Sequence, residues 1–243
     1  MSCPDDGLGL EGRVARRMER ACRSYAGFGV TPMVAVAGAV ADDILEAMLS
    51  ASRLDRAYVN NGGDIAVHLG EGQSFEIAMI ARPDAPVQQG GISLAAGGPA
   101  GVATSGRHGR SFSLGIADSV TALAENAAAA DAAATLIANA VDLPGNPLVR
   151  RAPARSLDSD SDLGDRLVTI DVAPLQDAEA RQAISAGLAF AQDLIDRHLI
   201  AAAALSLGDR QETIGDWARP SKKIDISTKL PIEPPRQKKA RPL

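Results

Sequence analysis

Three short segments of the sequence carry side chains that could recognise a phosphate group or a metal ion. In Asn60-Asn61-Gly62-Gly63-Asp64, two glycines between strand-like runs allow positive φ values and close approach of a ligand to the backbone. The second segment, 101–111, offers hydroxyls, backbone N–H groups and guanidinium groups, which are common partners of phosphate. Its candidate binding residues are Thr104, Ser105, Gly106, Arg107 and Arg110. If neither segment binds a ligand, the first is a tight hairpin turn and the second is a flexible surface loop.

The third segment places a carboxylate and a hydroxyl four residues apart. Asp131 and Thr135 share one face of a predicted helix. Such a pair suits a hard cation such as Mg²⁺, which takes its other ligands from water or phosphate; a solvated helix face fits the same spacing. Segment 101–111 lacks both the Gly-Lys-Ser/Thr ending of a P-loop and the glycine spacing of a Rossmann fingerprint. Neither of those nucleotide-binding folds is therefore expected.

Periodicity and propensity predict the elements that must position these segments. Helices are expected over 13–26, 32–51, 125–140 and 180–205. Strands are expected over 57–61, 64–69, 74–81, 91–96 and 168–173. Residues 143–165 are rich in Pro, Asp and Arg and are expected to form a long loop. This order favours an α+β fold, with a mixed or antiparallel sheet layered with helices, over strict βαβ alternation.

Composition divides the chain into three parts. Residues 13–207 are expected to form one α+β domain, after a mobile N-terminus over 1–12. A disordered, basic, Pro-rich tail over 208–243 should follow and be dispensable for folding. The residues from Arg219 onward carry a net charge of +6, so the remainder carries −11 within the total of −5. A body that acidic should repel nucleic acid.

The composition also argues against several classes of protein. Aromatic residues make up 3% of the chain, which offers few stacking platforms for single-stranded nucleic acid. No apolar run reaches the roughly 18 residues of a membrane span, and no basic-then-apolar secretory signal is present. Cys3 and Cys22 are too few for a disulfide scaffold. We therefore expect a cytoplasmic protein that binds neither nucleic acid nor membrane.

Taken together and in this order, the three segments resemble the ApbE-like superfamily. Its members carry an Asn-x-Gly-Gly-Asp turn, a Thr-Ser-Gly segment followed by arginine, and an Ala-Asp-x-x-x-Thr helix. These motifs correspond here to 60–64, 104–110 and 130–135. Residues 31–42 and 101–139 are closer still to an uncharacterised branch of archaea and bacteria. The resemblance covers about residues 12–207.

The better-known members of that superfamily are FAD:protein FMN transferases. They use Mg²⁺ to cleave FAD at its pyrophosphate and attach FMN to a Thr or Ser of an acceptor flavoprotein. The resemblance implies that Asp131 and Thr135 are metal ligands, with Asp131 also catalytic. The residues implied in flavin-nucleotide binding are Asn60, Gly62, Gly63, Asp64, Thr104, Ser105, Gly106, Arg107 and Arg110.

Two departures from the superfamily pattern leave alternatives open. A His- and Pro-containing segment of the transferases is replaced here by 113–119, in which Asp118 stands near the missing Asp and is the second candidate catalytic residue. Relatives also begin with further strand and helix before Gly12, so an open sheet edge is expected unless another chain covers it. The first hypothesis is a flavin-nucleotide-binding enzyme that uses FAD and Mg²⁺ and has an acceptor flavoprotein. The alternatives are a non-catalytic nucleotide-binding protein, and an accessory subunit completed by a partner or a second copy.

Overall fold

The computed structural model describes residues 9–80 and 88–217. The helices are α1 (Arg13–Arg23), α2 (Val36–Ala51), α3 (Ala127–Ala140), α4 (Ala154–Leu157) and α5 (Asp177–Asp196), with 3-10 turns η1 (Ala26–Phe28) and η2 (Pro32–Ala35). The strands are β1 (Arg56–Asn61), β2 (Asp64–Leu69), β3 (Ser74–Ile80), β4 (Gln88–Ala95), β5 (Gly101–Ser105), β6 (Ser119–Ala124), β7 (Val149–Pro153), β8 (Leu167–Val172), β9 (Ala202–Leu207) and β10 (Arg210–Gly215).

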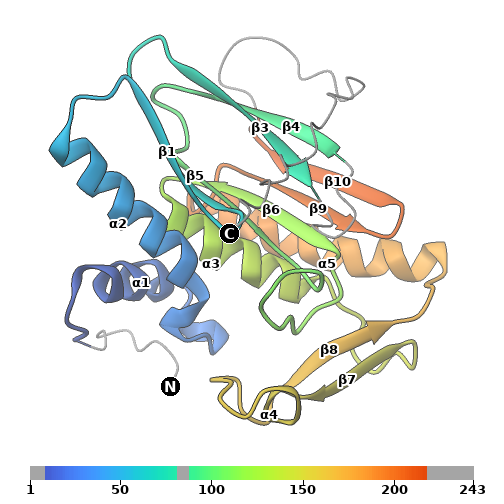
Figure 1. The fold of residues 1–243 in the computed structure, drawn as a ribbon. Helices are drawn as coiled ribbons and strands as arrows, with labels where there is room; N and C mark the ends of the chain where they lie inside the picture. The colour runs from blue at the N-terminus through green and yellow to red at the C-terminus, as the bar shows by residue number, and fades with distance from the viewer. Residues whose placement is uncertain (1–8, 81–87, 218–243) are drawn as a thin grey trace, which may run out of the picture.

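Six strands form one antiparallel sheet in the order β1-β2-β5-β6-β9-β10 (Figure 1). The β3–β4 hairpin is inserted between β2 and β5, and the segment from α3 to α5 connects β6 to β9. Strand β6 is buried along its whole length, as expected for a central strand covered on both faces. The polar ends of β2 and β5 lie beside each other because Ile65 pairs with Val102.

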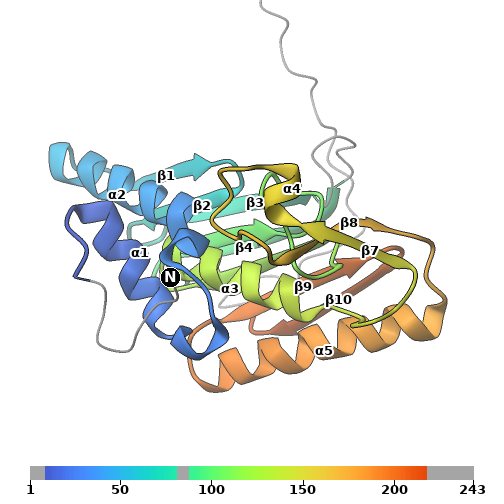
Figure 2. The same ribbon diagram turned by 90° about the horizontal axis from the view of Figure 1, so that it is seen from below.

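Helices cover one face of this sheet and the β3–β4 hairpin covers the other (Figures 1 and 2). On the helical side, alanines of α3 and residues such as Ile137 and Leu205 form the main core. On the opposite side, Ile92 and Leu94 of β4 pack with Val102 of β5. Because the α3 side chains on the sheet are small, the helix lies close to β5 and β6.

The architecture confirms the predicted α+β class, with an antiparallel sheet layered with helices. The predicted helix over 180–205 is wrong in its last part, since α5 ends at Asp196 and 202–207 form β9. His198 ends the helical segment with a φ of 57°, a left-handed conformation typical of helix C-termini. The alanine run of β9 has high helix propensity, but pairing with β6 and β10 and burial on the sheet determine its structure.

Other boundaries also differ from the sequence prediction. Strands β5 and β6 were not expected, and the predicted loop over 143–165 contains β7 and α4, with β7 paired to β8. The predicted tail over 208–243 starts too early, because 210–215 form β10 at the edge of the main sheet. Residues 218–243, residues 1–8 of the predicted mobile N-terminus and residue 81 of the predicted third strand lie outside the described residues.

Candidate functional site

The three predicted segments meet at one end of the sheet, near the turn that joins β1 to β2. Asn60 shapes this turn, because its Oδ1 accepts a hydrogen bond of 2.9 Å from the N–H of Gly63. Gly62 and Gly63 have φ values of 73° and 115°, which glycine adopts without strain. The Asn61 side chain donates to the carbonyl of Ala37 at 3.1 Å and so connects the turn to α2.

Asp64 and Asp131 are the paired carboxylates of the site. Asp64 is the first residue of β2, and Asp131 lies in the second turn of α3. Burial and the charge of Asp64 raise the pKa of Asp131 to about 8, although N–H groups of Gly38 and Ala37 lower it. Burial likewise raises the pKa of Asp64 to about 6, against the N–H of Thr104 and the charge of Arg110. Two carboxylates that repel each other inside a protein create a strong requirement for a cation or a shared proton.

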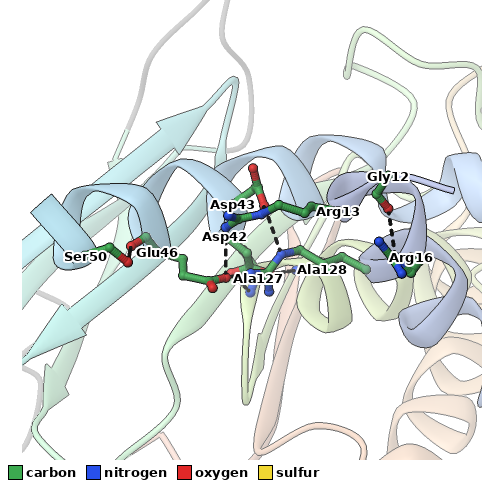
Figure 3. Close-up of polar contacts among 10 residues, drawn as sticks. Gly12, Arg13, Arg16, Asp42, Asp43, Glu46, Ser50, Ala127 and Ala128 are labelled. Atoms are coloured by element: carbon green, nitrogen blue, oxygen red, sulfur yellow. Dashed lines mark hydrogen bonds and ion pairs between the residues drawn. The ribbon is translucent and has the colours of Figure 1, made fainter.

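Helices α2 and α3 cap each other through two carboxylates. The Oδ2 of Asp131 accepts from the N–H of Gly38 in the first turn of α2 at 3.0 Å. In return, Asp42 of α2 accepts from the N–H groups of Ala127 and Ala128 at 3.0 and 2.9 Å (Figure 3). Each carboxylate thus satisfies helix N-terminal donors that have no partner within their own helix. This reciprocal capping fixes Asp131 relative to the turn that carries Asp64.

Gly38 makes this close contact between the helices sterically feasible. A Cβ at this position would lie 2.2 Å from the carbonyl oxygen of Ala127, far inside van der Waals contact. Neither Gly38 nor Asp42 was predicted from the sequence to have a role, although both fall within the segment 31–42 that carries the family resemblance. Only their helix-to-helix contacts, which periodicity does not report, give these two residues a function.

Hydroxyl groups line the same region. Thr135, one turn after Asp131, donates to the Oγ of Ser105 at 3.3 Å. Thr104 is exposed at the end of β5, and its Oγ1 lies 2.9 Å from the Oγ1 of Thr121. The structure therefore brings the second and third predicted segments together, with Ser105 and Thr135 in direct contact.

Arg110 lies over the β1–β2 turn. A Cβ built on Gly62 would be 1.8 Å from the Nη2 of Arg110 and 2.7 Å from its Cζ. The guanidinium therefore occupies the space that any side chain at position 62 would need. Its charge also acts on the Asp64 carboxylate. These contacts connect the first segment to the loop of the second.

Asp118 belongs to a different group of contacts. Its Oδ1 accepts from the Nε of Arg107 at 2.8 Å and lies 3.1 Å from the Nε2 of His108, and its Oδ2 accepts from the N–H of Gly208 at 2.7 Å. Gly106 packs against the Asp118 backbone, where a Cβ would lie 2.4 Å from the carbonyl oxygen. Within residues 9–80 and 88–217, no hydrogen bond or ion pair joins Asp118 to Asp64 or Asp131. The contacts of Asp118 with Arg107 and Gly208 hold the loop over 106–118.

The donor set at the paired carboxylates fits a hard divalent cation. Mg²⁺ is often bound by one or two carboxylates and completes its octahedron with water and phosphate oxygens. Asp64 and Asp131 supply the carboxylates, and Thr135 supplies a hydroxyl close by. Within residues 9–80 and 88–217, no three His, Cys, Asp or Glu side chains gather as an all-protein metal site. Two carboxylates and one hydroxyl would leave positions of a Mg²⁺ octahedron for water or phosphate oxygens.

A separate cavity of about 340 Å³ lies near the N-terminus of α3. Its lining includes none of the residues that were predicted to bind a ligand. Its lining consists of Arg17, Arg20, Ala21, Ser24, Tyr25, Asp42, Glu125, Asn126, Ala128, Ala129, His198 and Leu199. Asp42 already occupies the first N–H groups of α3 there.

Fold and site together define an antiparallel α+β protein with paired carboxylates and hydroxyls at one end of its sheet. The model of the family described as AbpE bacteria matches residues 3–217, and the chain belongs to this family. Similar proteins include UPF0280 proteins of three archaea. That of Methanopyrus kandleri is 41% identical over 133 residues, which are 54% of this chain and 51% of the relative. Those of Methanothrix thermoacetophila and Methanothermobacter thermautotrophicus are 40% and 39% identical over 51% and 54% of this chain, and 52% and 49% of their own lengths.

The family model and these archaeal relatives confirm the predicted kinship with a family of archaea and bacteria. The chain spans about half the length of the curated relatives it matches. In the part of the chain that the structure describes, no helix combines the length and apolarity that a membrane crossing requires.

Proposed function

We propose that this family is a branch of the ApbE-like superfamily and that the chain binds a flavin nucleotide, FAD, together with Mg²⁺. The observation that carries the proposal is the pairing of Asp64 and Asp131, which come from different motifs of the superfamily and lie within electrostatic reach of each other. The hydroxyl contact between Ser105 and Thr135 adds the remaining motif to the same region. Three unrelated surface segments would have no reason to make these contacts with one another.

Each group of the site has a chemical role in this proposal. Asp64 and Asp131 would hold Mg²⁺, with Thr135 beside them. The bound cation would neutralise charge on the pyrophosphate of FAD. Thr104 and Ser105 offer hydroxyls to the dinucleotide, and Gly62 and Gly63 allow its close approach to the turn. The N–H groups of Ala37 and Gly38 orient Asp131 toward the site.

FMN transfer to a Thr or Ser of an acceptor protein is the activity that the superfamily resemblance suggests. One observation favours the alternative of binding without transfer: Asp118, the second candidate catalytic residue, is fully engaged by Arg107, His108 and the Gly208 N–H. A carboxylate with three such partners is poorly suited to proton exchange with a substrate. Any cleavage of FAD would then depend on Asp131 and the cation alone.

The test is FAD binding by isothermal titration calorimetry, with Mg²⁺ and with EDTA, combined with chromatographic detection of AMP and FMN. We expect FAD to bind at least tenfold more tightly with Mg²⁺. Asp131→Asn should remove this Mg²⁺ dependence because it removes a charged ligand but keeps an acceptor for the Gly38 N–H. Release of AMP would establish the transferase-type reaction, and binding without release would establish the non-catalytic function.

Asp171→Asn is the matched control. It makes the same charge change at an exposed position on β8 and should leave FAD and Mg²⁺ binding unchanged. Equal affinity for FAD with Mg²⁺ and with EDTA would refute the cation site. Absence of FAD binding under both conditions would refute the proposed ligand.

A further inference from the structure

The Arg110 side chain lies against Gly62 and fits there only because residue 62 has no side chain. The guanidinium lies where a Cβ of residue 62 would be, with Nη2 1.8 Å and Cζ 2.7 Å from that position. Gly63 also has a positive φ, of 115°, but a Cβ there would meet nothing within 4 Å. Both glycines thus serve the backbone of the turn, and Gly62 additionally makes room for Arg110.

The charge of Arg110 acts on Asp64, one member of the carboxylate pair. It acts favourably on Asp64, which in turn repels Asp131. Arg110 itself is exposed and follows Gly109 in the loop over 106–118. By contrast, Arg107 of the same loop is held by Asp118. Arg110 is therefore the arginine of this loop that faces the site and has a solvent-exposed side chain free to change position.

We propose that Arg110 is a built-in cation of the site, which lies across the Gly62 turn and competes with a divalent metal ion for the Asp64 and Asp131 carboxylates. This inference rests on the proposed function, because it assumes that these carboxylates hold the metal. Arg110 lowers the affinity of the empty pair for metal, and once displaced it is available to an anionic ligand. The site therefore favours joint binding of a metal ion and a phosphorylated ligand over binding of the metal ion without the ligand.

The test is titration of the full chain with Mn²⁺ alone, followed by calorimetry, with no nucleotide present. Arg110→Gln should bind Mn²⁺ about tenfold more tightly than the wild type, since it removes a unit positive charge that acts on the Asp64 carboxylate of a site facing solvent. Arg150→Gln, which removes an exposed charge on β7, is the control and should bind like the wild type. The Mn²⁺ affinity of Arg110→Gln should also depend more on ionic strength, because the more negative site attracts the cation more strongly and salt screens that attraction.

A glycine pair provides a second measurement. Gly62→Ala should displace Arg110 and tighten Mn²⁺ binding in the same direction, and it should add nothing in the Arg110→Gln background. Gly72→Ala introduces comparable backbone strain, since Gly72 has a φ of 74° with nothing within 4 Å of its Cβ position, and it should leave Mn²⁺ affinity within about twofold of the wild type. If Gly62→Ala does not fold, the single substitution of Arg110 still decides the question.

The outcomes separate this inference from the proposed function. Tighter Mn²⁺ binding by Arg110→Gln supports the competition, even where the wild type binds too weakly to measure. If the wild type binds Mn²⁺ and Arg110→Gln binds it with equal or lower affinity, the proposed competition is overturned, while the metal site of the proposed function still stands. If neither protein binds Mn²⁺, both the metal site and the inference are refuted.

Discussion

Substitution of Asp131 by Asn should make the protein more stable when divalent cations are removed. The folded protein binds the Asp131 proton more tightly than the unfolded chain does, because burial and Asp64 raise its pKa from 3.8 to about 8. The stabilisation that comes with this proton is complete below about pH 4 and is lost as the pH rises through about 8. The amide of Asp131→Asn carries no charge at any of these pH values and can still accept from the Gly38 N–H.

The magnitude follows from the pKa shift. One pKa unit corresponds to about 1.4 kcal/mol, and roughly three units separate the ordinary pKa from neutral pH, so the upper bound at pH 7 is about 4 kcal/mol. Asp64 shares the repulsion, and the amide retains a desolvation cost of its own. We therefore expect Asp131→Asn to raise the free energy of unfolding by about 2 kcal/mol at pH 8 and by less than about half of that at pH 5.

Urea denaturation in EDTA at pH 5 and pH 8 measures this difference, with Asp171→Asn as the exposed control. With Mg²⁺ at pH 8 the order should reverse, because the cation stabilises only the protein that binds it. A stability difference that does not grow between pH 5 and pH 8, or a destabilised Asp131→Asn protein in EDTA, would refute the reasoning about the buried carboxylate pair.

Three further predictions concern the structure around the site. Gly38→Ala should lower the free energy of unfolding by about 2 kcal/mol, because its Cβ would meet the backbone of α3. Gly27→Ala, whose Cβ would meet nothing within 4 Å, should leave the free energy of unfolding unchanged, and urea denaturation compares the two variants. Asp118→Ala should lower the free energy of unfolding by about 2–3 kcal/mol, because the loop over 106–118 loses the contacts that hold it, while Mn²⁺ affinity should be unchanged. Loss of Mn²⁺ affinity at unchanged stability would contradict this structural role. A chain that ends at Gly208 should lose most of its cooperative thermal transition because it lacks β10, while an unchanged melting temperature would show that β10 is dispensable.

The sequence allowed the fold class and most helices to be predicted because their signals are local. The alanine-rich segment of α3 and the alternation in β2 and β3 depend on propensity and periodicity. The errors occurred where tertiary contacts override these signals. The alanines of β9 favour helix but become a sheet strand between two partners, and β10 is a polar edge strand with no alternation to detect.

The candidate site divides in the same way. Its polar and glycine-rich segments were recognisable as Asn60–Asp64, 101–111 and Asp131 with Thr135, because unusual residue types are clustered in short stretches. The contacts that organise them were not, since Gly38 and Asp42 act across the interface of two helices separated by about 90 residues in sequence. The engagement of Asp118 by Gly208 depends equally on a contact between remote segments.

The reciprocal capping of α2 and α3 has a consequence for how the domain opens. In each helix, the carboxylate that caps the other helix lies four residues, about one turn, after an N–H group that the other helix caps. In α2 these residues are Gly38 and Asp42, and in α3 they are Ala127 and Asp131. Fraying of either helix end therefore removes a cap from the other, and the two ends should open as one unit. Amide hydrogen exchange would detect this coupling as equal opening free energies at Gly38 and Ala128. A single-residue insertion in either helix would rotate one carboxylate by about 100°, so in evolution the two spacings should change only together.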